Sequence, residues 1–112
     1  MSGISTHILD TALGRPAAGI PVILERADSQ HWLTCASTIT DDDGRCSALL
    51  THEKVRAGRY RLTFATAPYY DRLHTPTLYP EICITFNVTA DHSRYHIPLL
   101  LTPFGYSTYR GT

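Results

Sequence analysis

The chain has 112 residues, of which 43% are apolar and 18% are charged, a composition typical of a folded globular domain. Its ten basic and ten acidic residues cancel, so the sequence offers no general attraction to nucleic acid or to an anionic membrane surface. We therefore expect a single domain over residues 1–112 whose function depends on a local site.

Two further features bear on the compartment. The first ten residues lack the charged start and the apolar stretch of a signal peptide, and no apolar run approaches the ~20 residues of a membrane-spanning helix. The three cysteines leave one unpaired in any disulfide scheme, and none lies in a Cys-x-x-Cys motif, which favours buried, reduced thiols. These features predict a cytoplasmic protein with no membrane partner.

The hydrophobic pattern is that of β-strands, because apolar and polar residues alternate or β-branched residues cluster without helical spacing. The expected strands cover residues 4–10, 19–26, 32–40, 45–50, 59–66, 82–88 and 95–101. One stretch, 67–76, instead predicts one or two helical turns after Pro68 that end before Pro76. The sequence therefore predicts an all-β, two-sheet antiparallel sandwich of seven to eight strands with one short helix.

The segment 41–45, Asp-Asp-Asp-Gly-Arg, superficially resembles the start of a calcium-binding loop. Such a loop needs a late glutamate, and Glu53 is not at the required distance. We interpret Asp43 and Gly44 as a hairpin turn with positive φ between the strands 32–40 and 45–50.

Two histidines and one arginine are candidates for chemistry. His7 shares a strand face with Ser5, and His96 lies on the polar face of its own strand. Each histidine is also compatible with simple exposure to solvent. Arg45 follows the Asp-Gly turn, where it is either a rim arginine or a rigidly held guanidinium that binds a carbonyl or carboxylate.

Other catalytic arrangements lack support in the sequence. There is no Gly-x-Ser-x-Gly elbow, and no cysteine has an adjacent histidine. His92 and His96 form a His-x-x-x-His pattern, but on a strand residues four apart are separated by ~13 Å. We therefore predict neither a metal nor a cofactor.

Four segments together resemble the 5-hydroxyisourate hydrolase family, the transthyretin-related enzymes of urate breakdown. They are THILDTALGRPAAGIPVIL (6–24), TDDDGR (40–45), LYPEICITF (78–86) and YHIPLLLTPFGYSTYRGT (95–112). The resemblance runs over nearly the whole chain. It implies a prealbumin-like (transthyretin-like) sandwich and a homotetramer, built as a dimer of dimers with its sites at the dimer–dimer interface.

The resemblance also implies a reaction: hydrolysis of 5-hydroxyisourate at the N1–C6 amide of its six-membered ring, giving 2-oxo-4-hydroxy-4-carboxy-5-ureidoimidazoline. The family motifs fall on His7, Arg45, His96 and a C-terminal tetrapeptide, here Tyr109, Arg110, Gly111 and Thr112. Where the family ends on serine this chain ends on threonine, which keeps the hydroxyl and adds a methyl group.

Roles follow from what the reaction needs: an activated water, a stabilised oxyanion and a proton for the departing nitrogen. The two histidines would move protons, and Arg45 would bind the carbonyls of the substrate. Tyr109 and Arg110 would close the pocket, while Thr112 and the terminal carboxylate would position water or substrate.

Two other functions compete with this prediction. Transthyretin shares the implied architecture and carries hydrophobic hormones, but it lacks the histidine, arginine and Tyr-Arg-Gly-Ser set. A partner-binding module could instead use an exposed edge strand to bind a peptide by β-augmentation.

Overall fold

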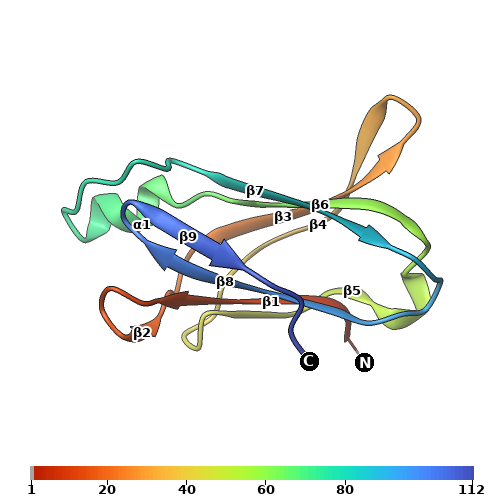
Figure 1. Ribbon diagram of the computed structural model, residues 1–112, viewed down its shortest axis with the longest axis horizontal. Coiled ribbons are helices and arrows are strands. Elements are labelled where there is room, and N and C mark those ends of the chain that lie inside the picture. Colours follow the sequence, from red (N-terminus) through yellow and green to blue (C-terminus); the bar gives the residue numbers. More distant parts are fainter. Residues whose placement is uncertain (1) are drawn as a thin grey trace.

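Nine strands form two β-sheets in the computed structural model, which describes residues 2–112 (Figure 1). In chain order the strands are β1 (Ser2–Asp10), β2 (Arg15–Pro16), β3 (Pro21–Asp28), β4 (His31–Ile39), β5 (Arg45–Thr51), β6 (Gly58–Phe64), β7 (Ile82–Val88), β8 (Tyr95–Thr102) and β9 (Gly105–Thr108). Helical structure in these residues is limited to a 3₁₀ turn, η1 (His52–Lys54), and the helix α1 (Ala67–Arg72). The predicted all-β sandwich with one short helix is confirmed; β2 and β9 are additional to the strands that we placed from the sequence.

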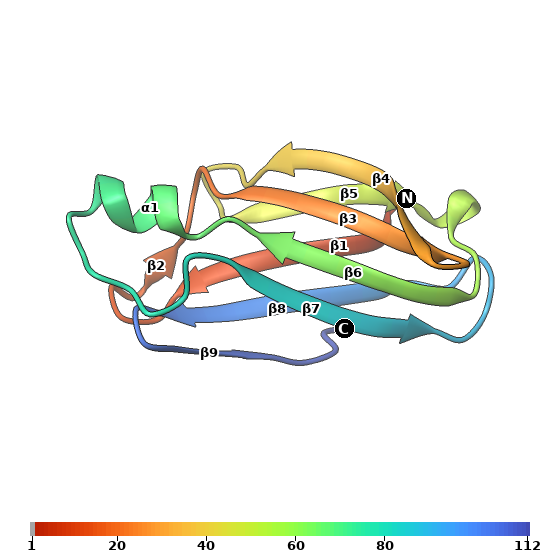
Figure 2. The same cartoon turned by 90° about the horizontal axis from the view of Figure 1, so that it is seen from above.

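The two sheets lie one above the other, with α1 at one end of the sandwich (Figure 1 and Figure 2). The first sheet contains β2, β1, β8 and β9 in that order, with β5 also paired to β1. The second sheet has the order β4-β3-β6-β7.

Strand β1 is the centre of the first sheet, because it pairs with β2 and β5 along one edge and with β8 along the other. The β1–β8 pair is parallel, whereas the other pairs of named strands in residues 2–112 are antiparallel. The prediction of a purely antiparallel sandwich is therefore wrong at this pair. Parallel neighbours need a long crossover, and the chain between β1 and β8 makes one through the second sheet.

The turn at residues 41–44 has the predicted conformation but not the predicted partners. Gly44 has φ +75°, and a Cβ atom there would collide with the carbonyl oxygen of Ile8. The strands that it joins do not form a hairpin, because β4 pairs with β3 and β5 pairs with β1. Turn chemistry fixes the local backbone, whereas the choice of partner strand depends on which faces must be buried.

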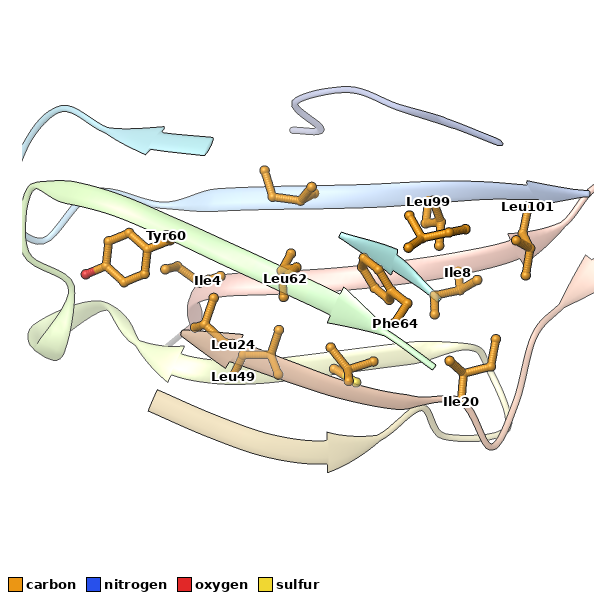
Figure 3. Close-up of a cluster of buried hydrophobic side chains, with 14 of the residues drawn as sticks. Ile4, Ile8, Ile20, Leu24, Leu49, Tyr60, Leu62, Phe64, Leu99 and Leu101 are labelled. Atoms are coloured by element: carbon orange, nitrogen blue, oxygen red, sulfur yellow. The ribbon is translucent and has the colours of Figure 1, made fainter. Parts of the chain in front are cut away.

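The core lies between the sheets and is built largely from inward-facing residues of β1, β3, β5, β6, β7 and β8 (Figure 3). Its fully buried members include Ile4, Ile8, Ile20, Val22, Leu24, Tyr60, Leu62, Phe64 and Leu99. Each large apolar side chain stabilises the fold by roughly 1.5–3 kcal/mol, and a slip of one residue would turn it outward. Burial of Ile4 and Ile8 therefore keeps Ser5 and His7 on the outer face of the first sheet.

Helix α1 is docked onto the end of β1 by a buried polar contact. The hydroxyl of Tyr69 donates a hydrogen bond of 2.6 Å to the carboxylate of Asp10, which is only 1% exposed. The N–H of Leu13 donates to the other carboxylate oxygen at 2.9 Å. Burial and the Asp10 hydrogen bond raise the pKa of Tyr69, so this hydroxyl keeps its proton.

The cysteines are free thiols, as predicted, but only one of them is buried. Cys46 lies in the core, where burial and then the charge of Asp41 raise its pKa to about 11. Cys35 is half-buried and Cys83 is exposed, so the prediction of buried thiols is wrong for these two. In residues 2–112 no helix is long and apolar enough to cross a membrane.

Candidate active site

Three strands bring the predicted histidines and Arg45 to one face of the first sheet. In the β1–β5 pair His7 lies opposite Arg45, and in the β1–β8 pair Ser5 lies opposite His96. Side chains of residues that are opposite each other in a sheet project from the same face. Residues far apart in the sequence therefore meet on the outer surface of β1, β5 and β8.

A hollow of about 810 Å³ lies on this face. The predicted residues that line it are Arg45, His96, Arg110, Gly111 and Thr112. His7 is not among the lining residues, but it lies beside them and its charge acts on His96. Tyr109 is also outside this hollow: together with Arg110 it lines a second, smaller one beside β7 and β9.

The hollow is rich in positive charge. Arg94 joins Arg45 and Arg110 in its lining, and neither Asp nor Glu is among the lining residues of the described chain. Guanidinium groups bind carbonyl and carboxylate oxygens through paired N–H donors, so this surface suits an electron-rich polar ligand.

His96 is held in place from two sides. Its Nδ1 lies 2.8 Å from the hydroxyl oxygen of Ser5. The backbone N–H of Gly111 donates to the His96 carbonyl at 2.7 Å, and a Cβ atom at Gly111 would lie only 2.7 Å from Cδ2 of the ring. Only glycine allows this approach of the C-terminal segment to the imidazole.

The electrostatic surroundings keep His96 neutral. Burial lowers the pKa of His96 below its usual 6.5, and the positive charges of His7 and Arg45 lower it further. At neutral pH the imidazole therefore has a lone pair on one ring nitrogen and a proton on the other.

The C-terminal segment continues the line of β9 along β8. Gly111 forms a bridge with His96, in the register that the β8–β9 pairing would reach if it were extended. Between the bridge and the ladder lies Pro98, which has no N–H to donate. Arg110 leaves the strand here and stacks its guanidinium on the ring of Tyr95, 4.0 Å from its centroid. Its Nη2 donates to the carbonyl of Arg94 at 3.1 Å.

Arg45 takes its position from the turn before it. Its backbone N–H donates to the Asp41 carboxylate at 2.9 Å, and its carbonyl accepts the N–H of Asp41 at 3.0 Å. The side chain is exposed and lines the hollow. These two hydrogen bonds fix the backbone of Arg45, from which the side chain extends. A fixed backbone supports the interpretation of Arg45 as a residue that binds a carbonyl or carboxylate, over that of a loose rim residue.

The sequence prediction missed several residues of the hollow, among them Arg94 and Ser5. Arg94 precedes His96 by two positions, and that spacing places both on one face of an extended chain. Ser5 has the same relation to His7, but its contact with His96 depends on the β1–β8 register, for which the sequence has no signal. The described residues contain no group of three or more His, Cys, Asp or Glu side chains able to hold a metal ion.

Comparison with known proteins identifies the family. A model described as "HIUase/Transthyretin family" matches residues 4–111. The 5-hydroxyisourate hydrolase of Mus musculus is 39% identical over 113 residues, which are 99% of this chain and 96% of that protein. The chain belongs to the HIUase/Transthyretin family.

Solved structures of this family have the same fold. The 5-hydroxyisourate hydrolase of Klebsiella pneumoniae superposes with a TM-score of 0.87 at 36% identity, and all of both chains is covered. Transthyretin from Sparus aurata superposes with a TM-score of 0.92 at 26% identity, covering 99% of this chain and 97% of that one. Since an enzyme and a transthyretin both superpose over nearly the whole chain, the HIUase/Transthyretin fold does not decide the function, and the side chains of the hollow must.

Proposed function

We propose that this chain is a 5-hydroxyisourate hydrolase, a cyclic amidohydrolase of urate degradation in the cytoplasm. The observation that carries the proposal is the meeting of Arg45 and a neutral His96 in one hollow, next to His7. Relatives with the name 5-hydroxyisourate hydrolase support the substrate. The reaction adds water to the N1–C6 amide and yields 2-oxo-4-hydroxy-4-carboxy-5-ureidoimidazoline.

The first step is attack of water on C6 of the substrate. A neutral imidazole takes a proton from the water as its oxygen bonds to C6, so the lowered pKa of His96 suits a base at neutral pH. His7, opposite Arg45 in the sheet, is the second group able to move a proton. Either histidine can be the base in this scheme.

The second step is collapse of the tetrahedral intermediate. Arg45 stabilises the negative charge on the former carbonyl oxygen, and its fixed backbone keeps the cost of reorganisation low. When the C6–N1 bond breaks, N1 receives the proton that the histidine took from water. Atoms and charge then balance without a metal or a cofactor.

The C-terminal residues would bind the substrate. Arg110 lines the hollow, but its stacking on Tyr95 must leave part of the guanidinium exposed to the ligand. Thr112 brings a hydroxyl to the same hollow. Tyr109 is 57% exposed and lies outside it, so we assign its role to the assembled protein, where a second chain can cover it.

The working form would be a homotetramer, a dimer of dimers with the hollow at the dimer–dimer interface. Large apolar side chains on the surface of the single chain support this assembly, since a monomer would leave them in water. They include Leu13, which is 52% exposed, Ile39 at 60%, Leu78 at 61% and Phe104 at 67%.

A hormone carrier of the transthyretin type is the second candidate, because transthyretin has the same fold. Three arginines line the hollow, and burying them under an apolar ligand would cost desolvation free energy without hydrogen bonds in return. Thyroxine binding tighter than micromolar, without hydrolysis, would favour the carrier.

An ultraviolet assay tests the proposal directly. Freshly generated 5-hydroxyisourate is mixed with the protein, and its decay is compared with the spontaneous rate and with that in the His96→Ala variant. We expect the protein to accelerate the decay and the variant to lose most of that acceleration. A decay at the spontaneous rate with the folded protein would refute the proposed function.

A further inference from the structure

We propose that Ser5 is a positioning residue for His96, whose hydroxyl holds the imidazole by Nδ1 and leaves Nε2 as the nitrogen that meets the substrate. This inference builds on the proposed hydrolase function, since that function gives His96 its task. The contact itself is a property of the folded chain.

The β1–β8 pairing sets the geometry of the contact. Ser5 and His96 are directly opposite each other in a parallel ladder that runs from Ile4 to Asp10 on β1. Beside Ser5, the hydroxyl of Thr6 donates to the carbonyl of Ile97 at 2.6 Å, which adds a side-chain link between the two strands. The 2.8 Å separation of the Ser5 oxygen and Nδ1 therefore rests on a fixed backbone.

The opposite edge of the ring packs against the C-terminal segment. Cδ2 lies against Gly111, where a Cβ atom would be 2.7 Å away. With Nδ1 on Ser5 and Cδ2 on Gly111, a rotation of the ring by 180° would put a carbon against the hydroxyl and lose the hydrogen bond. The accessible nitrogen is therefore Nε2.

A hydroxyl is well suited to a ring that changes its protonation state. While Nε2 has the lone pair that can accept a proton, Nδ1 carries the proton of the neutral ring, and the oxygen of Ser5 accepts its hydrogen bond. As Nε2 takes a proton from the attacking water, the resulting imidazolium donates from Nδ1 to Ser5. The ring keeps its partner through the whole cycle.

The charged groups around His96 explain why a neutral partner is needed. His7 on β1 and Arg45 on β5 act on His96 with positive charge, Arg94 and Arg110 are further basic residues of the hollow, and no Asp or Glu of the described chain lines it. A carboxylate at position 5 would favour the imidazolium and remove the base at neutral pH. A serine hydroxyl orients the ring without a negative charge that would raise the pKa of His96 again.

The first test follows His96 itself and does not depend on the reaction. The protein is labelled with ¹⁵N and ¹³C at histidine, and the His96 signals are assigned by comparison with His96→Gln. In Ser5→Ala the imidazolium loses the acceptor of its Nδ1–H, so we expect its pKa to fall further, by about 0.5–1 unit. The exposed Ser37 on β4, in the other sheet, supplies the control variant Ser37→Ala, which should leave the titration unchanged.

The second test is kinetic and uses a matched pair. Ser5→Thr keeps the hydroxyl, whereas Ser5→Val has the same branched shape without it. With 5-hydroxyisourate we expect Ser5→Val and Ser5→Ala to lower kcat roughly tenfold with KM within about twofold. Ser5→Thr should stay within about threefold of the original kcat, because it keeps the hydroxyl that orients the ring. The pair remains informative if the smaller side chain of Ser5→Ala perturbs the fold.

The outcomes separate the two proposals. An unchanged His96 titration in Ser5→Ala, or equal kcat values for Ser5→Thr and Ser5→Val, would overturn the assignment of Ser5. If the unaltered protein does not accelerate 5-hydroxyisourate decay, the proposed function fails, and the histidine titration alone decides whether Ser5 orients the ring.

Discussion

At the scale of single residues, Arg45 and His96 carry the proposed chemistry. Truncation of either should lower the rate of 5-hydroxyisourate loss by at least ~100-fold, because one stabilises the oxyanion and the other moves a proton. The variants Arg45→Ala and His96→Ala are assayed beside Arg59→Ala, an exposed arginine on β6 in the other sheet. Circular dichroism establishes that each variant is folded. A near-normal rate in either site variant would remove that residue from the mechanism.

The pH dependence of the reaction also belongs to this scale. The pKa of His96 lies below 6.5, so the ring stays neutral, and able to accept a proton, until the pH falls below that value. We expect the acid limb of kcat/KM below pH 6.5, measured with the spontaneous decay subtracted at each pH. An acid limb at or above pH 7 would assign the base to another group.

The pKa of His96 also affects the stability of the fold. The unfolded chain protonates His96 more readily than the folded chain does, so His96 lowers the stability of the fold as the pH drops through 6.5.

At the scale of elements, the segment after β9 does more than end the chain. The Gly111 N–H donates a hydrogen bond to the His96 carbonyl on β8, and the Arg110 guanidinium stacks on the ring of Tyr95. Deletion of residues 109–112 removes these contacts but leaves the β8–β9 ladder, which spans Leu99–Thr102 and Gly105–Thr108. We expect activity to be lost while the melting temperature changes by only a few degrees. Retained activity would show that the segment is dispensable.

Helix α1 offers a test of the fold that is independent of the site. Tyr69→Phe removes the hydrogen bond to the buried Asp10 carboxylate and should cost about 1–3 kcal/mol in the free energy of unfolding. Tyr70, its neighbour, has a buried hydroxyl without a hydrogen-bond partner in the described structure, so Tyr70→Phe should be neutral or slightly stabilising. Urea titrations of both variants measure the difference. Equal losses would mean that ring packing, and not the hydrogen bond, docks the helix.

The elements also show what the sequence could and could not predict. Alternation of apolar and polar residues predicted the strand 59–66, and its apolar members Tyr60, Leu62 and Phe64 are buried in the structure, because burial on one face of a strand imposes a period of two. The same rule placed His7 and His96 on the outer faces of their strands. Which strands become neighbours depends on which arrangement buries the apolar faces of all the strands together, and no short stretch of sequence encodes that arrangement. The parallel β1–β8 pair and the contact of Ser5 with His96 were therefore beyond sequence reasoning.

At the scale of the whole molecule, the proposed tetramer has a physical basis in the surface of one chain. Phe104 is 67% exposed and Leu13 is 52% exposed, and β7 and β9 each form one edge of their sheet in residues 2–112. Unpaired edges and exposed apolar side chains favour association. Sedimentation at micromolar concentration should give a mass near four times 12.5 kDa. A monomer alone would contradict a site that needs several chains.

The parallel pairing of β1 with β8 has a consequence for the growing polypeptide. During synthesis β1 can pair with β5 as soon as that strand leaves the ribosome, but its other edge must wait for β8, since Ser5 and His96 are separated by 91 positions. Contacts of such long range are formed slowly, because the loop between them must first be closed. The imidazole therefore acquires its serine partner only when nearly the whole chain has been made. A nascent chain stalled before β8 would contain His7 and Arg45 but would lack His96, so the proposed site would stay incomplete until synthesis is nearly finished.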